Sequence, residues 1–354
     1  MTERAFARVL TAFSVLAALA LAACSGGSGT GTLPGTPSAI GEQSTQAFGT
    51  GQGVPSVMYF SHEGVQRSSA PLPSTLGQNV TYLPDGGIAH IMHFGQPGVA
   101  PNVQPNMTYH GGPIEKSPKQ VLVLWGFGSC SGTVPPTCTN DPNHTTEILV
   151  HFLQNVGGSH WLSVVTQYTS TAQGHITNPT HTLISPLLID TAAAPLHPTE
   201  QDVINASFAA EQFLVAHHVV SGINKDINYV VALGRNHNPS GFRPGGFCAF
   251  HASWVINGRP PAQPFTDFPY VASAGAGCGG NSVSGPNDGV SIVLGHETAE
   301  AITDPFGNAW FDSSGNEIGD KCAFMNLGFT TLLNSDHDVV QPLWSNAVHR
   351  CVRL

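Results

Sequence analysis

Three side chains in the segment VLGHETAEAITDPFGNAWFD, residues 293–312, have types and spacing that suit a bound metal ion. His296 and Glu300 are four residues apart, so on a helix they lie on one face about one turn apart. Zinc accepts both imidazole nitrogen and carboxylate oxygen, so this pair is half of a chemically sound site. Glu297 is offset by one residue and would project beside the ion.

The sequence has the same spacing as the His-Glu-x-x-His motif of zinc metallopeptidases but differs in one residue type. Glu300 stands where the motif has its second histidine. In those enzymes the glutamate beside the first histidine is the general base that activates the metal-bound water. We therefore expect Glu297 to be the catalytic residue. Asp304 continues the same helix face and could be a ligand, a hydrogen-bond partner of a ligand, or simply the last acid of the helix.

The third ligand must come from another part of the chain. Downstream, the segment DSSGNEIGDKC offers Asp312, Glu317 and Asp320, of which we prefer Asp320 and then Glu317. Upstream, the segment FCAFHAS places His251 on an expected strand. Zinc is the expected cofactor, and calcium is the alternative because oxygen-rich ligation suits calcium better than zinc.

The motif is expected to lie on a buried helix. Asn287 and Asp288 are favourable helix-start residues, and Pro305 ends the helix just after Asp304. Apolar residues dominate the segment between these limits. Charged groups on such a helix should be paired or bound to metal, because burying them unpaired is costly.

The elements around this helix indicate an α/β or α+β fold. The apolar runs QVLVLWGF, INYVVALG and GFCAFHASWVI predict strands, and TTEILVHFLQNV predicts a helix. A second helix should follow Thr199, which is a favourable N-cap with Asp202 three residues later. Together these elements predict a single zincin-like domain with a mixed sheet and a buried active-site helix.

The first 23 residues have the features of a bacterial lipoprotein signal peptide. Arg4 and Arg8 precede a short apolar run that ends in Leu-Ala-Ala-Cys at Cys24. We expect lipid on Cys24 and anchoring on the extracytoplasmic side of a membrane of the bacterial cell envelope; a plain secretory peptide is the alternative. Residues 24–54 are rich in Gly, Ser and Thr and are expected to form a flexible tether. Residues 55–105 are expected to be a lead-in segment that could supply edge strands. Residues 106–354 are expected to form the main domain.

Composition and cysteine content agree with export. Only 10% of the residues are charged, and a net charge of −10 with 12 basic residues argues against nucleic acid as a partner. Six cysteines besides Cys24 predict three disulfides in an oxidising compartment. Pairing by proximity in the sequence gives Cys130–Cys138, Cys248–Cys278 and Cys322–Cys351.

Several motifs, in order along the chain, resemble the EXORDIUM or phosphate-induced protein family of plant cell walls and its bacterial relatives. They are MTYHGGPIEKSPKQVLVLWGF, GFCAFHA, FPYV…GCGG and DGVSIVLGHETAEAITDPFGNAWFDSSGNEIGDKC. The resemblance covers residues 107–354 and implies an extracellular protein, but no biochemical activity is established for the family. Some plant members lack the His-Glu pair that this chain keeps. In the last block, His-Glu-x-x-Glu, Asp-Pro and Glu-Ile-Gly-Asp follow one another as in the family. This order makes Asp304, Glu317 and Asp320 better candidates for the metal site than spacing alone did.

Two functions follow from these observations. The first is an envelope-anchored zinc metallohydrolase, a peptidase in which Glu297 activates water. The alternative is a non-catalytic extracytoplasmic protein that binds a wall polymer or signalling partner and has a structural acidic site. A glycosidase using Glu297 and Glu300 is disfavoured, because carboxylates three residues apart on one helix seldom straddle a glycosidic bond. No residue identifies the substrate.

Overall fold

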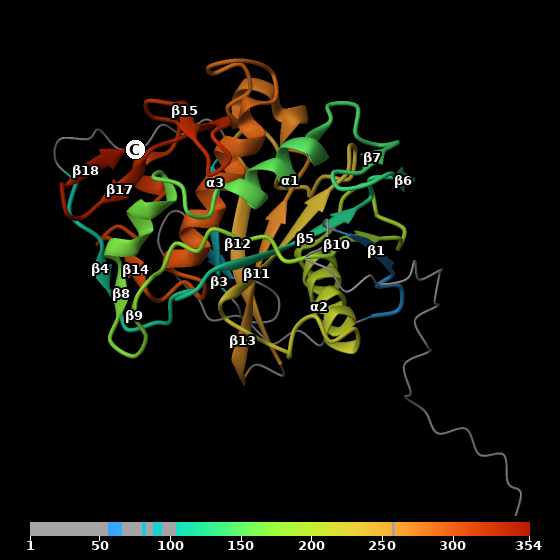
Figure 1. Cartoon of the computed structure of the whole chain (residues 1–354), viewed down its shortest axis with the longest axis horizontal. Coiled ribbons are helices and arrows are strands. Elements are labelled where there is room, and N and C mark those ends of the chain that lie inside the picture. Colours follow the sequence, from blue (N-terminus) through green and yellow to red (C-terminus); the bar gives the residue numbers. More distant parts are fainter. Residues whose placement is uncertain (1–55, 66–79, 83–87, 94–103, 257–258) are drawn as a thin grey trace, which may run out of the picture. The chain divides into compact units, whose positions relative to one another are not determined.

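A computed structural model describes residues 56–65, 80–82, 88–93, 104–256 and 259–354 (Figure 1). The predicted signal peptide, Cys24 and the predicted tether fall outside these residues. In the part of the chain that is described, none of the helices has the length and apolar character needed to cross a membrane.

The centre of the fold is a mixed eight-stranded sheet, which confirms the predicted mixed α/β architecture. Pairing is parallel from β1 through β10, β5 and β11 to β13, and antiparallel from β13 through β12 and β3 to β2. In order across the sheet, the strands are β1 (Val57–Phe60), β10 (Leu187–Asp190), β5 (Lys119–Trp125), β11 (Ile227–Leu233), β13 (Arg259–Phe268), β12 (Phe247–Ile256), β3 (Ile88–His93) and β2 (Val80–Tyr82).

The segment expected as a lead-in contributes both edges of this sheet. Strand β1 pairs with β10 at one edge, and β3 and β2 follow β12 at the other. Strand β3 therefore lies beside the strand that carries His251, whose Cα register partner on β3 is His90.

Helices cover both faces of the sheet. Helix α2 (Glu200–Ala216) packs on one face, and α1 (Thr145–Asn155) and α3 (Asp288–Thr303) pack on the other (Figure 1). Strand β5 shows why two cores form: Leu122 and Leu124 enter the core with α1 and α3, whereas Val121 and Val123 enter the core with α2. A parallel central strand is buried on both faces, so its sequence is continuously apolar.

The predicted helix starts and ends are confirmed where the sequence carries capping residues. The Thr199 side chain accepts a hydrogen bond from Asp202 N, and Asp202 Oδ2 accepts one from Thr199 N, which completes a capping box on α2. Helix α3 ends at Thr303, before Pro305, and all its residues are buried. Gly295 lets α3 pack closely, because a Cβ atom there would lie 3.0 Å from Trp161 and 3.1 Å from Phe152.

Short elements complete the fold around α3. There are three 3-10 helices among the described residues, η1 (Leu162–Gln167), η2 (Val271–Cys278) and η3 (Asp320–Cys322). The two-stranded sheets pair β14 (Trp310–Phe311) with β4 (Thr108–Tyr109), β15 (Gly328–Thr331) with β16 (His337–Val340), β17 (Leu343–Ser345) with β18 (Arg350–Val352), β6 (Cys130–Ser131) with β7 (Thr137–Cys138), and β8 (Thr169–Ser170) with β9 (Gly174–His175).

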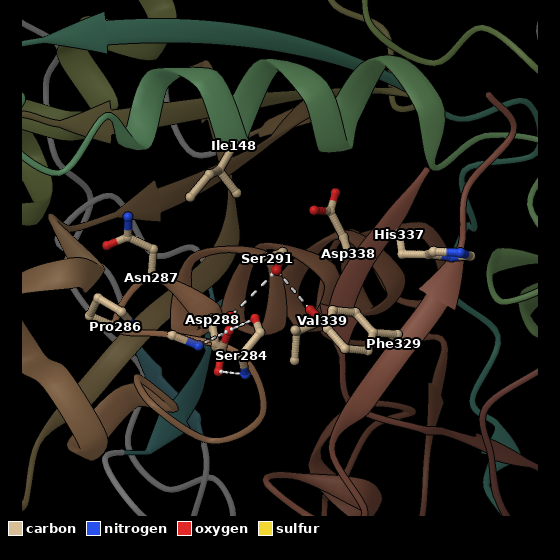
Figure 2. Close-up of a pocket in the computed structure, with 11 residues that line it drawn as sticks. Ile148, Ser284, Pro286, Asn287, Asp288, Ser291, Phe329, His337, Asp338 and Val339 are labelled. Atoms are coloured by element: carbon tan, nitrogen blue, oxygen red, sulfur yellow. Dashed lines mark hydrogen bonds between the residues drawn. The ribbon is translucent and has the colours of Figure 1, made fainter. Parts of the chain in front are cut away.

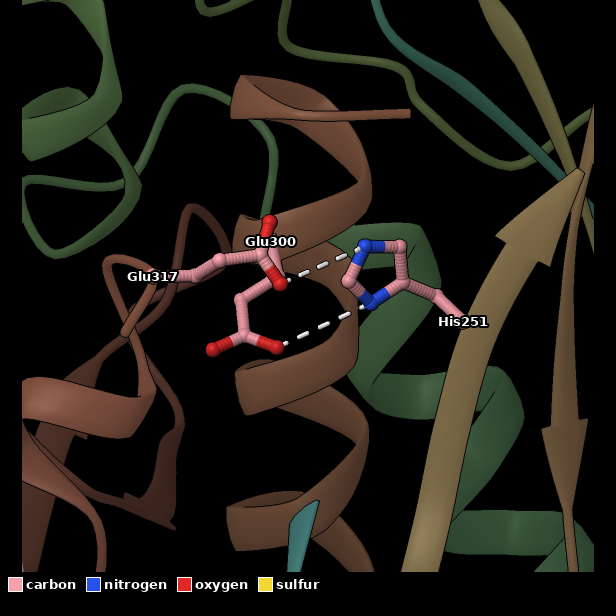
Figure 3. A group of neighbouring side chains, drawn as sticks. All are labelled: His251, Glu300 and Glu317. Atoms are coloured by element: carbon pink, nitrogen blue, oxygen red, sulfur yellow. Dashed lines mark ion pairs between the residues drawn. The ribbon is translucent and has the colours of Figure 1, made fainter. Parts of the chain in front are cut away.

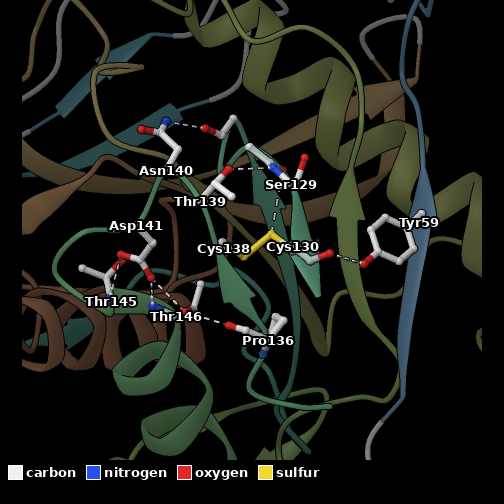
Figure 4. Close-up of a disulfide and its surroundings, with 12 residues drawn as sticks. Tyr59, Ser129, Cys130, Pro136, Cys138, Thr139, Asn140, Asp141, Thr145 and Thr146 are labelled. Carbon is white, nitrogen blue, oxygen red and sulfur yellow. Dashed lines mark hydrogen bonds between the residues drawn. A yellow bond between two sulfur atoms is a disulfide. The ribbon is translucent and has the colours of Figure 1, made fainter. Parts of the chain in front are cut away.

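The three predicted disulfides are present with the predicted pairing, Cys130–Cys138, Cys248–Cys278 and Cys322–Cys351. The first joins β6 to β7 (Figure 4), and the hydroxyl of Tyr59 donates a hydrogen bond of 2.9 Å to Cys130 O, which ties this hairpin to β1. The second joins β12 to η2. The third joins η3 to β18, and so fixes the loop that approaches α3.

Candidate metal centre

Helix α3 brings the three motif residues into the protein interior. The side chains of His296, Glu297 and Glu300 are all 0% exposed. The Nε2 atom of His296 lies 3.0 Å from Oε2 of Glu300, as the four-residue spacing predicts. The Nδ1 atom of His296 makes no hydrogen bond within the described part of the chain, and the Nε2 atom has the Glu300 carboxylate as its neighbour.

The loop before and within η3 supplies the two downstream acids. Asp320 Oδ1 lies 3.8 Å from His296 Nε2, and the backbone N–H of Asp320 donates a hydrogen bond of 2.9 Å to Glu300 Oε1. Gly319 permits this close approach, since a Cβ atom there would lie 2.7 Å from His296 Nδ1 and 2.8 Å from Glu300 Oε1. Both preferred downstream candidates, Asp320 and Glu317, therefore reach the helix.

Several contacts hold this loop in place. Gln341 donates a side-chain hydrogen bond of 2.8 Å to Gly319 O, and the backbone N–H of Trp344 donates one of 3.0 Å to Ile318 O. The buried amine of Lys321 lies 2.7 Å from Asp312 Oδ2 and over the ring of Trp344. The position of the loop is thus fixed by β17 and the residues before it as well as by its own turn.

His251 enters the site from β12, on the side opposite the loop (Figure 3). Its Nδ1 atom lies 3.2 Å from Glu297 Oε2 and 3.6 Å from Glu300 Oε2, and its Nε2 atom lies 3.7 Å from Glu317 Oε2. The sequence offered His251 as a candidate but ranked it below the downstream acids. The alternation of side chains along a strand could have indicated that His251 faces α3. His251 lies on the same strand face as Ala249, which belongs to the core that contains α3.

These residues form two groups that could each hold a metal ion. The first is His251, Glu300 and Glu317, and the second is His296, Glu300 and Asp320. In each group, one ligand atom from every residue lies within 4.8 Å of the others. Mixed imidazole and carboxylate donors fit Zn²⁺ or Mn²⁺, whereas Ca²⁺ takes oxygen ligands, so the acids alone would serve calcium.

Asp304 lies outside both groups and has a different contact set. Its Oδ1 atom accepts hydrogen bonds from the backbone N–H groups of Asn308, at 2.6 Å, and Ala309, at 2.7 Å. The other oxygen makes no hydrogen bond with the residues that the structure describes. Burial raises the pKa of Asp304 to about 7, although the Ala309 N–H opposes this shift. Asp304 therefore orders the turn that follows α3.

Burial and neighbouring charges shift the pKa values of Glu317, Glu297, His296 and His251. Burial and then the charge of Glu300 hold the pKa of Glu317 well above its usual range, and burial raises the pKa of Glu297 despite the hydrogen bond from His251. Burial lowers the pKa of His296, but the charge of Glu300 more than offsets this and raises it to about 10. The pKa of His251 is also raised, because its hydrogen bond to Glu297 outweighs the effect of burial. Without a cation, the cluster therefore retains protons that a metal ion would displace.

The cluster is closed to solvent on most sides. The side chains of His251, His296, Glu300 and Glu317 are at most 1% exposed, and that of Asp320 is 6% exposed. Asp320 is therefore the most exposed residue of the two groups. A separate pocket of about 270 Å³ lies at the N-terminal half of α3, between Ser291, Ile148 on α1 and Phe329 on β15 (Figure 2). No residue of the two groups lines it, so this pocket is distinct from the candidate metal centre.

Comparisons of the chain with protein-family models, curated proteins and solved structures returned no match. The candidate centre is defined by the geometry of α3, β12 and the loop before η3.

Proposed function

We propose that this chain is an extracytoplasmic zinc-dependent hydrolase of peptides, held at the bacterial cell envelope through lipid on Cys24. The observation that carries the proposal is the arrangement around α3. A glutamate, Glu297, adjoins the candidate ligand pair His296 and Glu300 and is oriented by an imidazole from another element.

The side chains present could divide the chemistry of hydrolysis between them. His296, Glu300 and Asp320 would hold the ion, which when bound lowers the pKa of coordinated water and polarises a carbonyl. His251 holds one oxygen of Glu297, while Oε1 of Glu297 makes no hydrogen bond within the described residues. That oxygen is available to accept the proton of the attacking water. The raised pKa of Glu297 brings this base closer to neutral pH, where general bases act best.

The surrounding fold supports the same assignment. The buried helix α3 packs against a mixed sheet, which is the organisation expected of a zincin-like domain, and the sequence motifs resemble the EXORDIUM family. The three disulfides suit an oxidising compartment, as expected for an exported lipoprotein.

A second candidate function is favoured by the burial of the cluster. A catalytic ion needs an open position for water and substrate, whereas a structural ion is enclosed by protein. The low exposure of His296 and Glu300 suits a structural ion, zinc or calcium, in a non-catalytic protein that binds a wall polymer or signalling partner. Bound zinc fits both candidates, which then differ in turnover, whereas bound calcium fits only the second.

Metal analysis and peptide hydrolysis of one set of variants separate these functions. Full-length protein in detergent, purified without added metal, should contain zinc, and His296→Ala should lose it. Glu297→Gln should keep the zinc and the folded state but lose at least about 100-fold in casein hydrolysis, which is the contribution typical of a general base. Glu147→Gln is the matched control, because Glu147 lies at the exposed start of α1.

Each contrary result excludes a different part of the proposed function. A metal-free protein would remove the basis of both candidates. Bound zinc or calcium without hydrolysis of any peptide substrate would favour the structural role. Hydrolysis that survives in Glu297→Gln would exclude Glu297 as the base.

A further inference from the structure

The carboxylate of Glu300 is approached by two imidazoles from different elements. Its Oε2 atom lies 3.0 Å from Nε2 of His296, on the same helix, and 3.6 Å from Nδ1 of His251, on β12. Its Oε1 atom accepts the hydrogen bond from Asp320 N. Glu300 is therefore central to the cluster, with the loop and the strand on different sides of it.

The two imidazoles belong to separate ligand groups. His296 groups with Asp320, and His251 groups with Glu317, while Glu300 is the member common to both. A single ion bound to Glu300 between His296 and Asp320 would leave the other nitrogen and carboxylate in a second, equally buried group. The Nδ1 atom of His296 adds independent support, because it makes no hydrogen bond with any described residue although the ring is fully buried.

The charge of the cluster also suits more than one ion. The two groups and the adjacent Glu297 together carry four carboxylates, of which Glu297, Glu300 and Glu317 are fully buried and Asp320 is 6% exposed. One divalent ion would balance half of this negative charge, and two would balance all of it. Both imidazoles face the same oxygen of Glu300, Oε2, so a bridge between two cations would use this atom while Oε1 keeps its hydrogen bond from Asp320 N.

We infer that Glu300 bridges two divalent cations, one bound by His296 and Asp320 and the other by His251 and Glu317. This inference rests on the metal-dependent function proposed above, and extends it from a single zinc ion to a two-metal centre for Zn²⁺ or Mn²⁺. In such centres the paired ions clamp the attacking and leaving groups of a hydrolytic reaction. His251 is then a metal-binding residue as well as the partner of Glu297.

Manganese binding to the full-length protein in detergent tests the inference. Protein stripped with a chelator and dialysed against Mn²⁺ should bind two ions per chain, and its electron paramagnetic resonance spectrum should show two coupled ions. His296→Asn and His251→Asn should each retain one ion and give the spectrum of an isolated Mn²⁺. Glu300→Gln should abolish the coupling. The control His175→Asn, at an exposed strand, should retain both ions.

The outcomes distinguish this inference from the proposed function. One ion in the wild-type chain, lost equally in His251→Asn and His296→Asn, would show a mononuclear site: it would overturn the bridge and leave the metal-dependent function intact. No bound ion would overturn both. Asp320→Asn and Glu317→Gln provide a second pair that changes no ring packing, and each should remove one ion from a chain whose circular dichroism spectrum is unchanged.

Discussion

Gly319 lies against the imidazole of His296, so closely that a Cβ atom on Gly319 would be 2.7 Å from His296 Nδ1. The same Cβ atom would be 2.8 Å from Glu300 Oε1. The backbone of the loop therefore lies against side chains of the helix, and the distance between Asp320 and His296 depends on the absence of a side chain at position 319.

Gly319→Ala should weaken metal binding without removing any ligand. The added methyl group must displace either the His296 ring or the loop, and changes next to metal ligands typically cost about 10- to 100-fold in affinity. Competition with a chromophoric chelator would measure the loss. Gly285→Ala is the matched control, since no atom lies within 4 Å of its added Cβ atom. Equal affinities for the two variants would mean that the loop does not determine the geometry of the site.

The Cys322–Cys351 disulfide should contribute to metal affinity as well as to stability. It joins η3, in which Cys322 follows Asp320 by two residues, to β18. Replacing both cysteines with serine should lower the free energy of unfolding by about 2–5 kcal/mol, as removal of a native disulfide usually does, and should also lower the affinity for zinc.

Replacing Cys130 and Cys138 with serine is the comparison for that experiment. This disulfide joins β6 and β7, which contribute no residue to the cluster, so its loss should reduce stability while the affinity for zinc stays unchanged. Isothermal titration calorimetry and urea unfolding of the two double variants measure the two effects separately. A similar loss of affinity in both would show that destabilisation alone accounts for it.

Asp304→Asn should leave the metal content unchanged. Asp304 lies outside both ligand groups, and its Oδ1 atom accepts hydrogen bonds from the N–H groups of Asn308 and Ala309. Asparagine keeps one acceptor oxygen, whereas Asp304→Ala removes both bonds and should cost about 1–3 kcal/mol of stability. Loss of metal in Asp304→Asn, measured by elemental analysis against Asp320→Asn, would instead make Asp304 a ligand.

The sequence predicted the parts of the site that depend on local signals. The start and end of α3 follow from Asn287, Asp288 and Pro305, and the i to i+4 spacing places His296 beside Glu300. The disulfides could be paired because each links cysteines at most 30 residues apart. These features need no knowledge of how distant segments meet.

The position of His251 depends on long-range strand pairing, which the sequence does not specify. Strand β12 reaches the cluster because it pairs with β13 on one side and with β3 on the other, and β3 comes from a segment about 160 residues earlier in the chain. The division of Glu317 and Asp320 between two ligand groups likewise depends on the turn of the loop, because they are only three residues apart. Spacing alone could rank these acids but could not assign each to a histidine.

The metal-free protein should lose stability as the pH rises above neutral. Burial lowers the pKa of His296, but the charge of Glu300 raises it from 6.5 to about 10 in the folded protein. The folded chain therefore holds a proton that the unfolded chain releases between these values, so this stabilisation is complete below pH 6.5 and disappears as the pH rises through about 10. For a chain of this size, each kcal/mol lost should lower the melting temperature by roughly 2–4 °C.

Thermal unfolding between pH 6 and 10, with a chelator and with excess zinc, measures this effect. Zinc replaces the protons on the cluster, so its affinity should increase with pH and the zinc-loaded protein should show a much weaker decline. His296→Gln removes the titrating group and should flatten the profile of the chelated protein relative to the exposed control His175→Gln. If the chelated wild type and His296→Gln decline in parallel, then His296 holds no extra proton in the folded chain and the charge of Glu300 is balanced by another group.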